Sequence, residues 1–182
     1  MGKVLIVDDE KSIRNTLGEF LKKEGISVET AAEAEEAIRL LDDDEFDVIV
    51  SDIIMPKISG MEMVDRIRKS SQSIQIIIMT GEPTVDTAVK SVQNGANDYL
   101  IKPIARGDFI RAVKQAMQVK KMIDDKAALE MQNQRYRKNL EEMVEKKTIE
   151  LQKAMQSIIS LLAGVVEVRD PYTAGHQRRV GN

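Results

Sequence analysis

Four short apolar runs along the chain end in polar residues whose side chains can carry chemistry. They read VLIVDDE, VIVSDIIMP, IIIMTGE and DYLIKP. Runs of this length that are rich in valine and isoleucine are typical of buried strands. A weaker run lies between the first two. The pattern therefore predicts five strands, at about residues 3–7, 27–30, 48–50, 74–79 and 99–101.

Stretches with helical periodicity separate these strands. They cover about residues 11–23, 34–41, 61–69 and 85–93, and a fifth begins near Asp108. Strands that alternate with helices favour an α/β fold in which helices cover both faces of a parallel sheet. We therefore expect a five-stranded, doubly wound parallel sheet. Gly25, Gly60 and Gly95 are expected to end helices.

Beyond Gly107 the strand pattern stops, and a charged stretch without glycine runs to Ala163. We expect one long helix there. Its apolar residues fit one heptad and then a second heptad offset by four residues, which indicates a stutter near residues 140–144. The first register contains Val119, Met122, Leu129, Tyr136, Leu140 and Met143, with Lys126 and Asn133 as polar positions. The second contains Val144, Leu151, Ala154, Ile158, Leu161, Val165 and Val168.

The preferred interpretation of this pattern is a parallel two-stranded coiled coil, which would make the protein a homodimer. Polar residues in the seam weaken such a pairing and can set its alignment. The alternative is a single amphipathic helix that lies on its own domain, although such a helix would be unusually long.

The composition limits the class of protein. The chain has 182 residues, of which 42% are hydrophobic, enough for one domain and a substantial appendage. It contains no cysteine, so disulfides and thiolate chemistry are excluded. The N-terminus has no basic and apolar leader, and the apolar stretch from Ala154 to Val166 is too short to span a membrane. We expect a cytoplasmic protein without a membrane partner.

The net charge of −3 is unevenly distributed. The chain has 12 basic and 20 acidic residues up to Ile104, and 15 basic and 10 acidic residues after it. An acidic first half argues against nucleic-acid binding there, and mixed signs in the second half are typical of a solvated helix. We expect no nucleic-acid partner for this chain.

The polar strand ends supply a set of groups suited to magnesium and phosphate. Asp8 and Asp9 follow the first strand, and Asp52 ends the third, so hard oxygen ligands for Mg2+ should meet at one edge of the sheet. Asp52 stands alone and is the candidate nucleophile toward phosphorus. Lys102 can pair with a phosphoryl oxygen, and the Thr80 hydroxyl can donate a hydrogen bond to another.

Each of these residues also has an ordinary structural interpretation. Asp8 or Asp9 alone could cap a helix, Asp52 could occupy a turn, Thr80 could fill the core, and Lys102 could be a solvated strand end. Their joint occurrence at the ends of the predicted strands favours a functional site.

The first 120 or so residues resemble the receiver domain of bacterial two-component response regulators. The residues that carry this resemblance are Asp8, Asp9, Asp52, Met55-Pro56, Gly60, Thr80 and Lys102-Pro103. The resemblance implies a flavodoxin-like fold, a cis peptide bond before Pro103, and a histidine kinase or phosphotransfer protein as partner. It also implies that phosphorylation acts on the surface formed by the fourth helix, fifth strand and fifth helix.

The resemblance also assigns roles to individual residues. Asp52 would be the phosphoacceptor, and Asp8, Asp9 and Asp52 would hold Mg2+ together with the backbone carbonyl of Ile54. Thr80 and Lys102 would sense the phosphoryl group. Tyr99 would be the switch aromatic, whose ring turns inward when Thr80 moves, although an aromatic on an edge strand can also simply pack. The side chains of Ile54 and Glu82 should flank the site and affect the lifetime of the phosphoryl group.

The end of the chain resembles the beginning of an HD-GYP domain, a metal-dependent phosphodiesterase that acts on cyclic di-GMP. The matching residues are Arg169, Asp170, Pro171, Tyr172, Thr173, Gly175 and His176. His176 would be a metal ligand only in a longer parent, because the other motifs of the family are absent here and one imidazole cannot satisfy a metal. We therefore expect this fragment not to be an enzyme.

The resulting division is a receiver domain at residues 1–120, a coiled-coil signalling helix at 121–160, and a truncated HD-GYP domain at 161–182. The expected function is to accept a phosphoryl group and to transmit this state to an output domain, a cyclic di-GMP phosphodiesterase in the parent. One alternative is a stand-alone docking and dimerisation module. Another is the receiver of a DNA-binding transcriptional regulator.

Overall fold

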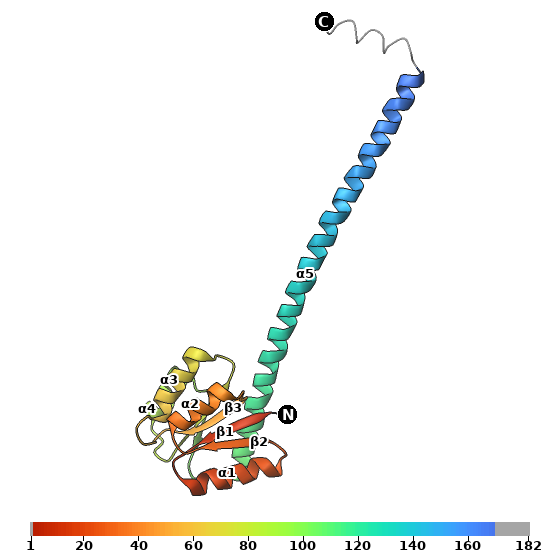
Figure 1. Ribbon diagram of the computed structural model, residues 1–182. Helices are drawn as coiled ribbons and strands as arrows, with labels where there is room; N and C mark the ends of the chain where they lie inside the picture. Colours follow the sequence, from red (N-terminus) through yellow and green to blue (C-terminus); the bar gives the residue numbers. More distant parts are fainter. Residues whose placement is uncertain (1, 170–182) are drawn as a thin grey trace. The chain divides into compact units, whose positions relative to one another are not determined.

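The computed structural model describes residues 2–169 of the chain (Figure 1). The chain divides into two compact units, Met1–Ala127 and Ala128–Asn182. The five strands described lie in the first unit, close to their predicted positions. They are β1 (Lys3–Val7), β2 (Ser27–Ala31), β3 (Val48–Asp52), β4 (Gln75–Thr80) and β5 (Asp98–Ile101).

These strands form one sheet in the order β2-β1-β3-β4-β5, and all neighbouring strands are parallel. The expected five-stranded parallel sheet is therefore confirmed. The strand order reverses direction between β1 and β3, and open α/β sheets bind ligands outside the carboxyl ends of the strands at such a point. β1 and β3 pair directly, with Val7 opposite Ser51.

Within residues 2–169, five helices connect and extend the strands. They are α1 (Lys11–Lys23), α2 (Ala34–Asp43), α3 (Gly60–Ser70), α4 (Val85–Gln93) and α5 (Arg106–Arg169). The start of α5 and α1 cover one face of the sheet, and α2 and α3 cover the other. Alternate residues of β1 point to opposite faces, so that Ile6 packs with Leu21 and Phe109 while Leu5 packs with Met63.

The glycines near helix ends have two different roles. Gly25 and Gly95 follow α1 and α4 with φ angles of 75° and 94°, the left-handed conformation that ends a helix with little strain only in glycine. The same expectation is wrong for Gly60, which begins α3. This helix is capped by Ser59 through a capping box with Glu62. The need for glycine at position 60 comes from packing against β3, described below.

In the second unit the structure describes one element, the continuation of α5 to Arg169. The long helix expected from the sequence is confirmed, and α5 contains 64 residues. The large apolar side chains described in this unit are exposed, among them Leu129, Leu140, Leu151, Ile158 and Val165. The coiled coil and the boundaries at residues 120 and 160 stay predictions. None of the described helices is long and apolar enough to cross a membrane.

Candidate functional site

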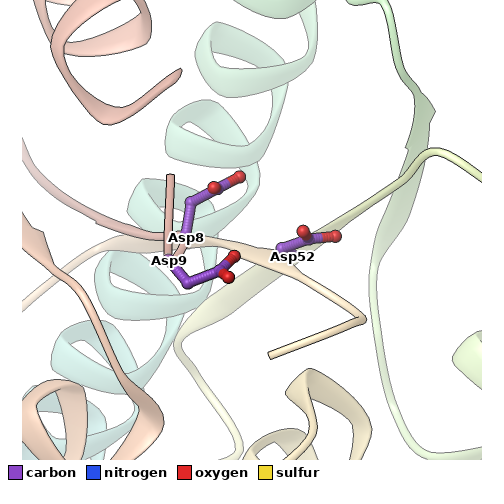
Figure 2. Close-up of side chains that lie close together, drawn as sticks. All are labelled: Asp8, Asp9 and Asp52. Carbon is purple, nitrogen blue, oxygen red and sulfur yellow. The ribbon is translucent and has the colours of Figure 1, made fainter. Parts of the chain in front are cut away.

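Three carboxylates converge at the carboxyl ends of β1 and β3. Asp8 and Asp9 follow β1 directly, and Asp52 is the last residue of β3. Because the two strands are neighbours, one carboxylate oxygen of each residue lies within 4.8 Å of the other two (Figure 2). Asp8 and Asp52 are buried, whereas Asp9 is exposed. The fold thus brings the three predicted carboxylates together.

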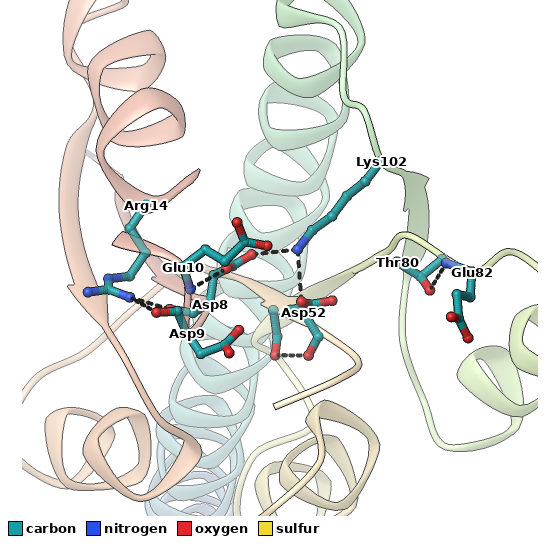
Figure 3. Close-up of polar contacts among 9 residues, drawn as sticks. Asp8, Asp9, Glu10, Arg14, Asp52, Thr80, Glu82 and Lys102 are labelled. Carbon is teal, nitrogen blue, oxygen red and sulfur yellow. Dashed lines mark hydrogen bonds and ion pairs between the residues drawn. The ribbon is translucent and has the colours of Figure 1, made fainter. Parts of the chain in front are cut away.

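A lysine that follows β5 reaches into this cluster. Lys102 Nζ donates to Oδ2 of Asp8 and to Oδ2 of Asp52, each at 2.8 Å (Figure 3). Burial opposes the charge of Lys102, but its hydrogen bonds to Asp52 and Asp8 outweigh this effect, and the net pKa lies above its ordinary value. The ammonium group is therefore charged at neutral pH and offsets part of the repulsion between the carboxylates. The peptide bond between Lys102 and Pro103 is cis.

The donor set fits a small, hard divalent cation. Carboxylate oxygens are the ligands that Mg2+ prefers, and Mg2+ is commonly bound by one or two carboxylates with the remaining positions left to other oxygens. Within the described residues this is the one cluster of three or more acidic or histidine side chains close enough to share an ion. Asp8, Asp9 and Asp52 would hold the ion. Ile54, whose backbone carbonyl is the further expected ligand, has a side chain that is 59% exposed.

Thr80 and Tyr99 lie on the neighbouring strands β4 and β5. Thr80 is buried, and its Oγ1 accepts a hydrogen bond of 3.1 Å from the backbone N–H of Glu82 (Figure 3). Tyr99 is half-buried against the core, and its hydroxyl lies 3.2 Å from Oγ1 of Thr87. In this arrangement Thr80 holds the loop that follows β4, and Tyr99 contacts the first turn of α4.

The backbone of the acidic pair is held by α1. Arg14 Nη1 donates to the carbonyl oxygens of both Asp8 and Asp9 (Figure 3). The N–H of Glu10 donates to Oδ1 of Asp8 at 2.9 Å. These bonds restrict the directions in which the two carboxylates leave the chain. Sequence reasoning missed Arg14, because one polar residue in an amphipathic helix pattern carries no distinguishing signal.

The opposite side of the site is formed by the start of α3. A Cβ atom added to Gly60 would lie 1.9 Å from the carbonyl oxygen of Asp52. The N–H of Gly60 donates to the carbonyl oxygen of Ile53 at 2.9 Å. The helix therefore begins directly against the residue that ends β3, and only glycine allows this approach. Sequence reasoning singled out Gly60 but for a different structural reason.

The other predicted residues are placed as follows. Glu82 follows β4 and is exposed. Arg169 is the last residue of α5. His176 and the rest of the predicted HD-GYP motif, residues 170–176, lie outside the described residues.

Comparison with known proteins assigns the first unit to a family. Residues 4–114 match the response regulator receiver domain family. The chain belongs to this family. The match covers the sheet except Lys3 and the first residues of α5, including Phe109 and Val113, which pack on the sheet. The first unit is therefore the receiver domain of a two-component response regulator.

Two curated relatives show the extent of the similarity. Response regulator MprA from Mycobacterium ulcerans (strain Agy99) is 31% identical over 126 residues, which are 69% of this chain and 54% of that protein. The DNA-binding transcriptional regulator NtrC from Azospirillum brasilense is 33% identical over 114 residues, which are 63% of this chain and 24% of that protein. The chain thus spans about half or less of the length of these relatives.

Two solved structures share the receiver fold. A response regulator receiver domain protein from Clostridium thermocellum has a TM-score of 0.64 at 33% identity, and the match covers 68% of this chain and 99% of that chain. The signal receiver domain of an HD domain-containing protein from Pseudomonas fluorescens Pf-5 has a TM-score of 0.64 at 26% identity, with coverage of 66% and 98%.

Proposed function

We propose that this receiver domain accepts a phosphoryl group on Asp52 from a histidine kinase or phosphotransfer protein. A carboxylate oxygen of Asp52 attacks the phosphorus of a phosphohistidine, a P–O bond forms as the P–N bond breaks, and the donor imidazole leaves. The observation that supports this proposal is the cluster of Asp8, Asp9 and Asp52 with Lys102 between two of them. The nucleophile, one counter-charge from Lys102, and two further carboxylates that can bind a cation lie together in a mostly buried site.

The residues around Asp52 have distinct tasks in this proposal. Asp8, Asp9, Asp52 and the backbone carbonyl of Ile54 hold Mg2+, which when bound neutralises charge on the carboxylates and the phosphoryl oxygens. Lys102 already contacts Asp52 and can pair with a phosphoryl oxygen there. Thr80 can donate its hydroxyl hydrogen to another phosphoryl oxygen.

Incubation with acetyl phosphate and Mg2+, followed by intact-mass spectrometry, tests this assignment. The wild type should gain the mass of one phosphoryl group, and Asp52→Asn should gain none. Asp65→Asn is a matched control, because Asp65 is an exposed aspartate on α3 whose ion pair with Lys69 contributes little. Labelling of Asp52→Asn at the wild-type level would refute Asp52 as the phosphoacceptor.

We propose that the phosphorylated state is passed on through α5 in a parallel coiled-coil homodimer. Apolar side chains of both heptad registers are exposed along the second unit, for example Leu140 at 45% and Leu151 at 63%, and a second copy would cover them. Light scattering with Mg2+, with and without beryllofluoride as a phosphoryl mimic, tests this step. A monomer under both conditions contradicts the dimeric helix, and Asp52→Asn serves as the control for the mimic.

We further propose that residues 169–176 open an HD-GYP output domain, in which His176 is a metal ligand and the parent protein is a cyclic di-GMP phosphodiesterase. The similarity of the receiver to that of an HD domain-containing protein supports this proposal. The relationship to a DNA-binding regulator supports the alternative of a transcriptional output. The gene sequence after the codon for Asn182 distinguishes them. His-Asp and Gly-Tyr-Pro motifs support the first, and a DNA-binding module supports the second.

A further inference from the structure

The described side chains of helix α4 bury little apolar area. Among its described side chains, Ser91 is buried, whereas Val85, Val89 and Val92 are 81%, 47% and 71% exposed. Buried apolar area is the main source of stabilisation for a surface helix. The polar contacts of these described residues therefore help to hold α4 on the receiver.

Two side-chain hydrogen bonds join the described residues of α4 to other elements. Ser91 Oγ lies 3.7 Å from the sulfur of Met61 on α3, which is a weak hydrogen bond. The hydroxyls of Thr87 and Tyr99 lie 3.2 Å apart and join the first turn of α4 to β5. Since the Tyr99 ring packs against the core of the sheet, this bond fastens the start of α4 to a well-packed group.

Thr87 is also part of the cap that begins α4. Thr84 Oγ1 accepts from the N–H of Thr87, and Thr87 Oγ1 accepts from the N–H of Thr84, each at 3.0 Å. The same Thr87 hydroxyl therefore serves the helix start and Tyr99. A movement of the cap must stretch or break the bond to Tyr99.

The cap is connected to the site by a short loop. Residues 81–83 separate Thr80 at the end of β4 from Thr84. Thr80 Oγ1 accepts from the N–H of Glu82, so the threonine and this loop are held together. A Cβ atom on Gly81 would meet no heavy atom within 4 Å, so there is open space beside the loop. A displacement of Thr80 can therefore reach the cap of α4.

We propose that Thr87 is a positioning residue. Its hydrogen bond to Tyr99 stabilises the arrangement of the loop at residues 81–83 and of the start of α4 in which Thr80 accepts from the N–H of Glu82. This inference rests on the proposed phosphorylation of Asp52. The phosphoryl group draws Thr80 toward Asp52 and breaks the bond between Thr87 and Tyr99. The strength of that bond sets how readily the phosphoryl group, or a mimic of it, is accommodated.

Titration with beryllofluoride and Mg2+, followed by backbone amide NMR signals, measures this effect. Thr87→Val and Tyr99→Phe each remove one hydroxyl and should each tighten beryllofluoride binding about 2- to 10-fold, the range for one net hydrogen bond. The double variant should bind no more tightly than the tighter single variant, because both changes remove the same bond. Thr87→Ser keeps the hydroxyl and should restore the wild-type affinity.

The matched control is Thr148→Val in α5, whose hydroxyl bonds only to the carbonyl oxygen of Val144 in its own helix. It should bind beryllofluoride as the wild type does. If the wild type binds the mimic but Thr87→Val shows unchanged or weaker affinity, the role of Thr87 is refuted while the proposed function stands. Additive effects in the double variant also refute it. If the wild type does not bind the mimic, the proposed function fails, and this inference fails with it.

Discussion

Replacement of Gly60 by alanine tests how closely the site depends on the packing of α3 against β3. The added Cβ would lie 1.9 Å from the carbonyl oxygen of Asp52, whereas real Cβ atoms essentially never approach a neighbour closer than 3.0 Å. The two segments must therefore move apart by about 1.1 Å. The obstacle is backbone, so no side chain can rotate away.

The cost of this movement can be estimated from two effects. Overpacking of this kind costs roughly 1–3 kcal/mol. Weakening of the hydrogen bond from the N–H of Gly60 to Ile53 adds roughly 0.5–1.5 kcal/mol. We expect Gly60→Ala to lower the free energy of unfolding by roughly 1.5–4.5 kcal/mol. Phosphorylation by acetyl phosphate should also slow, because the displaced backbone belongs to Asp52.

The assay is urea unfolding followed by the amide NMR signals of β1 and β3, which report on the receiver unit rather than on the far end of α5. Gly107→Ala is the control, because a Cβ there meets no atom within 4 Å and the position lies in a helix. Because Gly107 lies in the first turn of α5, this change should raise the free energy of unfolding by no more than roughly 0.5–1 kcal/mol, the gain in a helix interior. If Gly60→Ala is as stable as Gly107→Ala and is phosphorylated at the wild-type rate, the close-packing argument is wrong.

Three further predictions concern other parts of the receiver. Arg68 donates to backbone carbonyls in the turns before β4 and β5, so Arg68→Ala should destabilise the domain by roughly 2–3 kcal/mol in urea unfolding, and an unchanged midpoint contradicts this. A hydrogen bond from Lys114 holds the pKa of Glu24 in the folded protein below its ordinary 4.5. The contribution of this pair to folding stability is therefore fully present above pH 4.5 and is lost as the pH falls through the folded-state pKa. The stability difference between wild type and Glu24→Gln should therefore shrink below pH 4.5, and a constant difference would show that the ion pair contributes nothing. Substitutions at Ile54 and Glu82 should change the lifetime of the phosphoryl group on Asp52 without abolishing labelling. An unchanged lifetime in a dephosphorylation time course would show that these two side chains do not affect hydrolysis.

Sequence periodicity was sufficient to locate the elements of the receiver. The predicted bounds of β1, α1 and α4 agree with the structure, and the other elements of the receiver differ from prediction by a few residues at most. These patterns work here because the central strands β1, β3 and β4 are buried on both faces and read as continuous apolar runs, whereas a surface helix buries one stripe. Gly60 shows the limit, since a glycine beside a helix has several possible causes and only a neighbour in space distinguishes them.

By itself, the sequence determined which residues stand at the ends of which strands, because each apolar run stops where its strand stops. Since parallel strands align their carboxyl ends at one edge of the sheet, it also predicted that these residues meet. Only the tertiary structure decided that Lys102 bonds to both Asp8 and Asp52, across 94 and 50 residues of chain. It also decided that Arg14 holds the backbone of the acidic pair, and that Thr87 bonds to Tyr99. Such contacts depend on the path of each side chain between packed elements, and a local pattern of apolar and polar residues contains no record of that path.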